Sequence, residues 1–503
     1  MEIGYWSKMR SKVFMISKLF DDAAMNGNKE IIISVIEYVE LLIEKEKFTV
    51  LEKFQLLYSL GTAYSDLYTL DSEEKKELIQ EKELLNYRKA LEIYKKGDLD
   101  DITMLPQLYI NMGNGYFNVG RVMESIKYYD LAIELVSNHP MAWGCKGKTL
   151  EHLARMTYDT GHQDILLYEA YQSIQLALKN KEVYPYQKAI DIFEGISKRI
   201  EKHFDIEWLT KAFDFEEYEM GNAKEREYRI WSLENNLFLN ELNETVKNSA
   251  VAHDPLHLPI IVTELDFDYR LHGFINQIKQ DYVSARYIFY KATRNEGSAH
   301  FSDKEVYQVN TLDYAIHSLN DFQVKNVFKS AHSIFDKIAY FLNAYYKVGI
   351  KEKDIDFNTI WKTENGFNKR KYKYENPIVE KIHENLALKG LYWMAKDFYP
   401  VHNLVIAPNS KIIKEIRNHL EHKYVKTVDF ELISENSRVD GLAYYLTRNE
   451  LYNYTLMILK LSRDAILNLI MAVYQEEQIR KKSRGEGITP PVYLSAIKNE
   501  WKM

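Results

Sequence analysis

The chain has 503 residues, of which 46% are hydrophobic and 28% are charged, and its formal net charge is −7. This composition excludes a disordered or fibrous chain, and the length predicts two or three domains. Only 20 Gly and 10 Pro residues occur, which favours long helices over a turn-rich β architecture, because both residues disrupt helix interiors.

The single cysteine, Cys145, excludes a disulfide framework and a cysteine-based zinc cluster, and it suits a reducing cytoplasm. The start of the chain lacks the apolar region of a signal peptide. No segment approaches the roughly 18 uninterrupted apolar residues of a membrane span. We therefore expect a cytoplasmic protein without membrane contact.

Charge is divided unevenly along the chain. Residues 301–503 hold 30 Lys and Arg against 25 Asp and Glu, an excess of five positive charges, so residues 1–300 hold an excess of 12 negative charges. An acidic first part and a mildly basic second part suit a nucleic-acid site confined to the second part, although ordinary solvated helix faces would give the same balance.

Residues 1–204 contain an internal repeat. Gly147 follows Gly113 after 34 residues, Tyr129 occupies a large aromatic position between them, and an earlier unit is centred on Gly61. This spacing of small and aromatic residues resembles the tetratricopeptide repeat. The resemblance implies an array of paired helices whose groove binds a protein or peptide partner.

Residues 205–270 are rich in Asn and punctuated by Pro, which predicts a connector packed on a domain. Helical periodicity returns in residues 271–503 and predicts a helical bundle. The expected helices are 273–294, 305–320, 324–347, 377–396, 408–425 and 449–482. The predicted fold is therefore all-α, with a tetratricopeptide-like helical repeat array followed by a C-terminal bundle.

Common catalytic motifs are missing. The sequence holds no GxxxxGK[ST], HExxH, CxxC or GxSxG, which removes the corresponding hypotheses of an NTPase, a zinc peptidase, a zinc module and an α/β-hydrolase. None of the 14 His residues shows a metal-ligand spacing. We expect neither a metal site nor a cofactor.

One remaining segment carries residues suited to chemistry. Arg417 is followed by Asn418 and then, four residues later, by His422. An Arg followed by a polar residue, with His at this spacing, resembles the motif of the HEPN superfamily. The Arg-to-His spacing recurs at Arg155 and at Arg294, but only Arg417 lies in an uninterrupted helical pattern.

The resemblance implies a HEPN-like helical bundle with a metal-independent ribonuclease site. His422 can act as general base or acid on the RNA 2′-hydroxyl and the leaving oxygen. Arg417 can hold the phosphate where negative charge develops, and Asn418 can orient the imidazole or the phosphate. The products implied are a 2′,3′-cyclic phosphate and a 5′-hydroxyl.

Helix geometry adds a constraint on this site. Arg417 and His422 are five residues apart, about 140° around an ideal helix, so they do not share a face. Asn418 and His422, four residues apart, do share one. A local break in the helix, or two copies of the motif meeting across a two-fold axis, would bring both groups to one phosphate. Since HEPN relatives are typically dimers, we predict a homodimer formed through the bundle.

Several further residues are weaker candidates for substrate binding. They are Asp336, Lys337, His419, Lys369, Arg370, Lys371 and Lys373. The first pair lies on a preceding predicted helix and is equally consistent with a surface ion pair. The Lys369–Lys373 run, with interleaved tyrosines, could follow a phosphate backbone, although a charged loop is the commoner explanation.

The leading functional hypothesis is an endoribonuclease that acts as a toxin or antiviral-defence effector on tRNA or other RNA, with the repeats sensing a trigger or holding a partner. The alternative is a tetratricopeptide scaffold whose HEPN bundle is a catalytically inactive dimerisation unit. Under that alternative, Arg417 and Glu421 would form a solvated surface pair. A nucleotide-sensing bundle is a more distant third hypothesis.

Overall fold

The structure is a computed structural model. It describes residues 2–71, 73–97, 103–183, 185–263, 269–294, 299–362, 376–399, 409–429, 441–483 and 494–502. No helix within these ranges has the length and apolar character needed to cross a bilayer.

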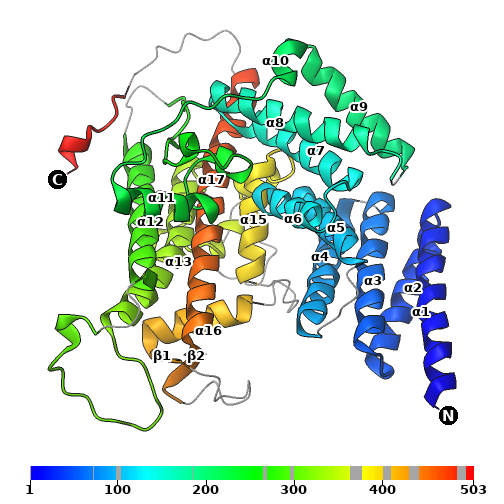
Figure 1. Ribbon diagram of the computed structural model, residues 1–503, viewed down its shortest axis with the longest axis horizontal. Coiled ribbons are helices and arrows are strands. Elements are labelled where there is room, and N and C mark those ends of the chain that lie inside the picture. Colours follow the sequence, from blue (N-terminus) through cyan, green and yellow to red (C-terminus); the bar gives the residue numbers. More distant parts are fainter. Residues whose placement is uncertain are drawn as a thin grey trace.

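The first part of the chain forms an array of antiparallel helices that curves around one side of a helical bundle (Figure 1). Its helices are α1 (Glu2–Met25), α2 (Lys29–Lys45), α3 (Val50–Leu70), α4 (Glu73–Lys96), α5 (Leu105–Asn118), α6 (Val122–Leu135), α7 (Pro140–Met156), α8 (Thr160–Lys179) and α9 (Gln187–Glu201). The predicted array of paired helices is therefore present.

The recurring glycines explain how these helices pair. A Cβ atom at Gly113 of α5 would lie 2.4 Å from the ring of Tyr129 on α6, so glycine is what lets the two helices approach. Gly61 of α3 meets Tyr87 of α4 in the same way, also at 2.4 Å. The regular spacing of small and aromatic residues is thus the spacing of helix-to-helix contacts.

A connector of short helices follows the array. It contains α10 (Ile206–Thr210), α11 (Ala223–Glu234), η1 (Glu241–Glu244) and η2 (Ser249–Val251). The asparagines fold the connector on itself, because Asn240 caps η1 at the backbone of Leu242 and Asn243 donates to the carbonyl of Leu233 at 3.0 Å. Asn enrichment in this segment therefore reflects local caps.

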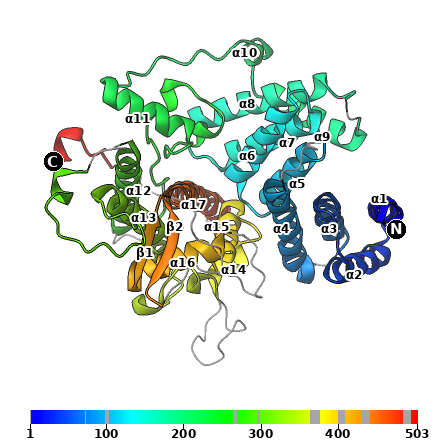
Figure 2. The same ribbon diagram turned by 60° about the horizontal axis from the view of Figure 1, so that its bottom comes forward.

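The second part of the chain is a bundle around the long helix α17 (Figures 1 and 2). Its elements are α12 (Arg270–Arg294), η3 (Phe301–Asp303), α13 (Leu319–Tyr345), η4 (Glu352–Asp354), η5 (Thr359–Trp361), α14 (Pro377–Lys381), α15 (Leu386–Phe398), α16 (Ser410–His422), β1 (Tyr424–Val428), β2 (Ala443–Thr447), α17 (Arg448–Ser483) and η7 (Asn499–Trp501). The all-α prediction is confirmed for the described residues, apart from this one pair of strands.

The two strands pair in parallel, with Tyr424 opposite Ala443, and they flank the end of α16 (Figure 2). These strands were not expected from the sequence, whose periodicity predicted a helix as far as residue 425. The helix ends at His422, and β1 then pairs with a strand that begins only at residue 443, so local periodicity could not show the partner.

The prediction of a helix at 305–320 was wrong for most of that range. Helix α13 begins only at Leu319. Asn310 and Asp313 bond to the backbone of Leu312 and Ala315, and these local bonds compete with helix formation. The backbone N–H of Ile316 donates a hydrogen bond to the carbonyl of Thr427 on β1, at 2.8 Å. This segment is therefore held by turns and by the sheet.

The helix predicted at 377–396 is interrupted. Asn385 accepts from the backbone of Leu388 at 3.0 Å and donates to the carbonyl of Ala472 on α17, so it starts α15 as a separate helix. The amide thus fixes both the beginning of α15 and its position against α17.

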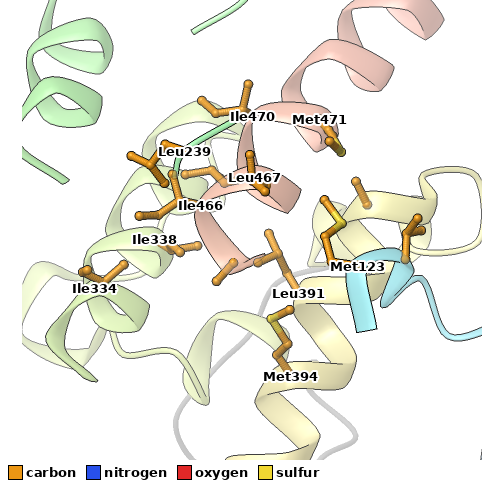
Figure 3. Close-up of a cluster of buried hydrophobic side chains, with 14 of the residues drawn as sticks. Met123, Leu239, Ile334, Ile338, Leu391, Met394, Ile466, Leu467, Ile470 and Met471 are labelled. Atoms are coloured by element: carbon orange, nitrogen blue, oxygen red, sulfur yellow. The ribbon is translucent and has the colours of Figure 1, made fainter. Parts of the chain in front are cut away.

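One apolar core joins the array to the bundle. Figure 3 shows Met123 of α6 in the same cluster as Leu391 of α15 and Leu467 and Met471 of α17. Gly120 and Gly390 meet backbone to backbone, since a Cβ at Gly390 would lie 2.4 Å from the Gly120 carbonyl oxygen. The array is therefore packed directly on the bundle.

Buried charges reinforce this junction. Asp397 of α15 accepts from Arg88 of α4 at 2.7 and 2.9 Å and also pairs with Arg121, which precedes α6. These two guanidinium groups hold the pKa of the Asp397 carboxyl below its usual value, although burial alone would raise it. A carboxylate on the helix next to Tyr399 is thus fixed by two arginines of the array.

Candidate active site

Helix α16 carries the predicted motif and is amphipathic. Ile413 and Ile416 are buried against the bundle, at 3% and 0% exposure. The opposite face is exposed and polar, with Lys411, Asn418 and His422 on it. Because its apolar stripe is fixed in the core, α16 presents this polar face outward.

Arg417 lies at the edge between the two faces of α16. Its Nη2 is 3.3 Å from Oδ2 of Asp336 on α13, and its Nη1 donates to the Tyr399 hydroxyl at 3.4 Å. The side chains of Arg417 and Asp336 remain 35% and 26% exposed. A guanidinium has five N–H donors, so these two long contacts leave most of its capacity for another acceptor.

The Asp336 carboxylate is also held by a backbone hydrogen bond. Its Oδ1 accepts from the backbone N–H of Phe357 at 3.2 Å. Burial raises the pKa of Asp336, and the Phe357 hydrogen bond and the charge of Arg417 oppose that rise. The predicted candidate Asp336 is therefore brought directly to Arg417.

Two groups beside Arg417 could not be predicted as site residues. Burial raises the pKa of Tyr399 to about 12, against the influence of Arg417, so its hydroxyl is a neutral partner. His332 of α13 is 5% exposed, and burial together with the Arg417 charge lowers its pKa to about 3. Nothing in the local sequence marks either residue, since only the fold places them beside Arg417.

His422 and Asn418 occupy the exposed face, away from Asp336. Within one chain, Arg417 points toward α13, whereas His422 is the last residue of α16 and is exposed to solvent. The two predicted groups thus diverge, as their five-residue spacing requires. Glu421 contacts Lys329 at 3.9 Å, so the expected alternative pair between Arg417 and Glu421 is replaced by pairs to α13.

The structure does not bring the remaining candidates to Arg417. His419 is 4% exposed, and its Nδ1 donates to the Glu415 carbonyl at 2.8 Å, so it is turned toward the bundle. Lys337 forms an ion pair with Asp281 of α12. The candidates Lys369, Arg370, Lys371 and Lys373 lie outside the described residues. In the described ranges, no group of three His, Cys, Asp or Glu residues has the arrangement of a metal site.

The connector is attached to the bundle by two buried arginines. Arg463 of α17 donates to the carbonyls of Phe238 and Asn240 at 2.7 and 2.8 Å and pairs with Glu244. Arg286 of α12 pairs with Asp254 at 2.8 Å. These arginines hold the connector in place and have no open face for a ligand, being 1% and 2% exposed.

The bundle therefore places Arg417 of α16 beside Asp336 of the neighbouring helix α13, with His422 on the exposed face of α16. Residues 262–476 match the family model described as LA2681-like HEPN. The matched region runs through Asp336, Arg417 and His422 and supports membership of this part of the chain in the HEPN superfamily. Neither the curated proteins nor the solved structures gave a significant match to the chain.

Proposed function

We propose that the chain is a metal-independent endoribonuclease of the HEPN type. This proposal depends above all on the exposure of Arg417 and on the hydrogen-bond donors that it has available. It is a partly exposed guanidinium whose contacts within the described residues leave further N–H donors, and it lies at the edge of an exposed face that bears Asn418 and His422. The HEPN match over residues 262–476 supports it, because many HEPN domains are ribonucleases.

The chemistry follows from the residue types. His422 takes the proton of the 2′-hydroxyl or supplies one to the leaving 5′-oxygen, because an imidazole can do both near neutral pH. Arg417 stabilises the additional negative charge of the phosphorane, and Asn418 orients the phosphate or the imidazole. The attack yields a 2′,3′-cyclic phosphate and a 5′-hydroxyl.

The divergence of Arg417 and His422 within one chain favours a homodimer. If the exposed faces of two α16 helices meet across a two-fold axis, each cleavage site takes Arg417 from one chain and His422 from the other. Lys411 and Lys414, also exposed on α16, would then lie on the same polar face as Asn418 and attract the RNA backbone.

The proposed role is that of a toxin or antiviral-defence effector that cleaves tRNA or other RNA in the cytoplasm. The helical array would sense the trigger or bind a protein partner. Its buried junction with α15 supports this division, because α15 is followed directly by Tyr399, which contacts Arg417.

The decisive test incubates total RNA with the purified protein in EDTA. We expect cleavage by the wild type and a loss of at least about 10²-fold in Arg417→Ala and in His422→Ala, as for a general acid–base residue. Lys202→Ala, at an exposed position after α9, is the matched control and should cleave normally. Cleavage that requires Mg²⁺, or that survives both substitutions, would contradict the proposal.

A second candidate function is a scaffold with an inactive bundle. It is favoured by the ion pair between Arg417 and Asp336, which occupies the arginine within one chain. On this hypothesis, the protein dimerises and binds a partner through its array, whereas RNA stays intact with every trigger. Sedimentation of the wild type and Arg417→Ala, run beside the cleavage assay, separates the two functions.

A further inference from the structure

The two-stranded sheet has a buried face and an outward face. Val425 of β1 and Tyr444 of β2 are buried in the bundle, at 3% and 5% exposure. Successive side chains of a strand point to opposite faces, and Lys426 lies opposite Tyr445 in the register of the two strands. Tyr424, Lys426 and Tyr445 therefore share the outward face, on which Tyr424 is 42% exposed.

Lys426 holds the side chains of this outward face together. Its Nζ donates to the Tyr445 hydroxyl at 3.0 Å, and it lies 5.0 Å from the centre of the Tyr445 ring and 5.5 Å from the centre of the Tyr424 ring. The same ammonium group pairs with Asp313 at 2.5 Å. The charge of Lys426 is thus balanced by a carboxylate, and its contacts fix the positions of the two aromatic rings.

The sheet is packed against the helix that bears His422. His419 of α16 is 4% exposed, and its ring lies 5.5 Å from the ring of Tyr444 on the buried face of β2. Lys325 of α13 donates to the backbone carbonyl of Val425 on β1 at 2.7 Å. The outward face therefore has a fixed position relative to α16.

The outward face begins beside His422. Lys423 alone separates His422 from Tyr424, so the Cα atoms of His422 and Tyr424 lie within about 7.6 Å of each other. All three residues are exposed to solvent, as are Lys411 and Lys414, which lie on the same stripe of α16 as His422. An exposed aromatic ring at the end of a row of cations is the combination by which proteins bind single-stranded nucleic acids.

We propose that Tyr424 stacks against an unpaired base of the RNA beside the scissile phosphate and that Lys423 contacts the adjoining phosphate. This inference rests on the proposed ribonuclease function, to which it adds the substrate class. Every base offers a π-face to a tyrosine ring, so the subsite accepts any base. A base inside a duplex is stacked on its neighbours and cannot reach the ring, so the substrate is a single-stranded segment.

The test separates binding from cleavage by using the full chain in a His422→Ala background. The probes are a short single-stranded RNA that carries 2-aminopurine, whose fluorescence reports its stacking, and the same RNA in a duplex. Tyr424→Ala removes the ring, Tyr424→Phe retains it, and Tyr186→Ala changes a tyrosine of the array that is 55% exposed. Thermal unfolding confirms that each variant folds.

We expect Tyr424→Ala to bind the single-stranded probe about ten-fold more weakly, the effect of losing one stack between a base and an aromatic ring. The fluorescence change on binding should disappear as well. Tyr424→Phe and Tyr186→Ala should bind as the background protein does, and the affinity for the duplex should be unchanged in every variant. The proposal is overturned if the background protein binds no single-stranded RNA, if a folded Tyr424→Ala binds it as tightly as Tyr186→Ala, or if both probes lose affinity equally.

Lys423→Gln tests the phosphate contact. The slope of log K against log salt should fall by about 0.7 in this variant, because each single-strand phosphate contact contributes about that amount, and it should not change in Tyr424→Ala. Lys202→Gln, at an exposed position after α9, is the control. An unchanged slope in Lys423→Gln overturns this contact.

Failure of this inference can be told from failure of the proposed function. Cleavage by the wild type together with normal RNA binding by Tyr424→Ala overturns the base subsite alone. Binding that depends on the Tyr424 ring, in a protein whose wild type leaves the same RNA intact, overturns the ribonuclease function alone.

Discussion

Arg417 and Arg463 are both arginines of the bundle that pair with a carboxylate from another element, yet their surroundings are opposite. Arg463 is 1% exposed and is surrounded by Glu244, Asp464 and two backbone carbonyls. Arg417 is 35% exposed and, among the described residues, contacts Asp336 at 3.3 Å and Tyr399 at 3.4 Å. Burial and unused donors, more than the presence of a salt bridge, therefore distinguish an arginine that can bind substrate from one that stabilises the fold.

The largest effect expected from this comparison concerns stability. Arg463→Met should destabilise the protein by about 3–5 kcal/mol, because it leaves the buried Glu244 carboxylate and two carbonyls without their donor. Arg417→Met should cost less than about 1 kcal/mol, since its pair is partly exposed. Urea unfolding of both variants measures the difference. Equal losses would show that the two arginines have the same structural role.

A smaller effect concerns the pH dependence of stability. The pKa of His332 is lowered to about 3 in the folded protein, so the unfolded chain binds the proton more readily. Because only the unfolded chain takes up this proton, the free energy of unfolding decreases as the pH falls below about 6.5, by about 2 kcal/mol at pH 5. His332→Leu should remove this loss between pH 7 and pH 5.

The variant Arg417→Met tests how far the charge of Arg417 contributes to the low pKa of His332. Without the nearby positive charge, the pKa of His332 should rise and the loss of stability at pH 5 should be smaller than in the wild type. Unfolding midpoints at pH 5 and pH 7 measure this change. An identical pH dependence in all three proteins would mean that the imidazole does not titrate as proposed.

The smallest effect concerns the partner of Arg417. Asp336→Asn removes the charge that Arg417 contacts and should strengthen its attraction for a phosphate, lowering KM for RNA by about two- to five-fold, the effect of an exposed ion pair. Asp281→Asn, which removes the partner of Lys337 on α12, is the matched control and should leave KM unchanged. A higher KM in Asp336→Asn would mean that Asp336 positions Arg417 productively.

The fold could be predicted from the sequence where each element carries its own signal. The glycines at 61 and 113 mark helix pairs, and the long apolar pattern of α17 marks the centre of the bundle. The prediction failed where distant partners decide the conformation. The segment before Leu319 is held by turns and by Thr427, and β1 depends on a strand that begins at residue 443.

In the candidate site, too, residues with a local sequence signal could be predicted, whereas those placed by distant packing could not. Arg417, Asn418 and His422 could be selected because their spacing is local, and Asp336 was selected through the family resemblance. Tyr399 and His332 were missed, because their approach to Arg417 depends on how α13, α15 and α16 pack. His419, one of the weaker candidates for substrate binding, is turned into the bundle. Sequence spacing therefore indicated which residues share a helix but not which face meets another helix.

The contact between Gly120 and Gly390 has a mechanical consequence. Main chain touches main chain there, so no side chain is available to change rotamer and absorb a displacement. We therefore expect a displacement of the array at Gly120 to shift α15 with it. Helix α15 leads directly to Tyr399, whose hydroxyl accepts from Arg417, so the contact between the two glycines joins the array to the helix that precedes this partner of Arg417.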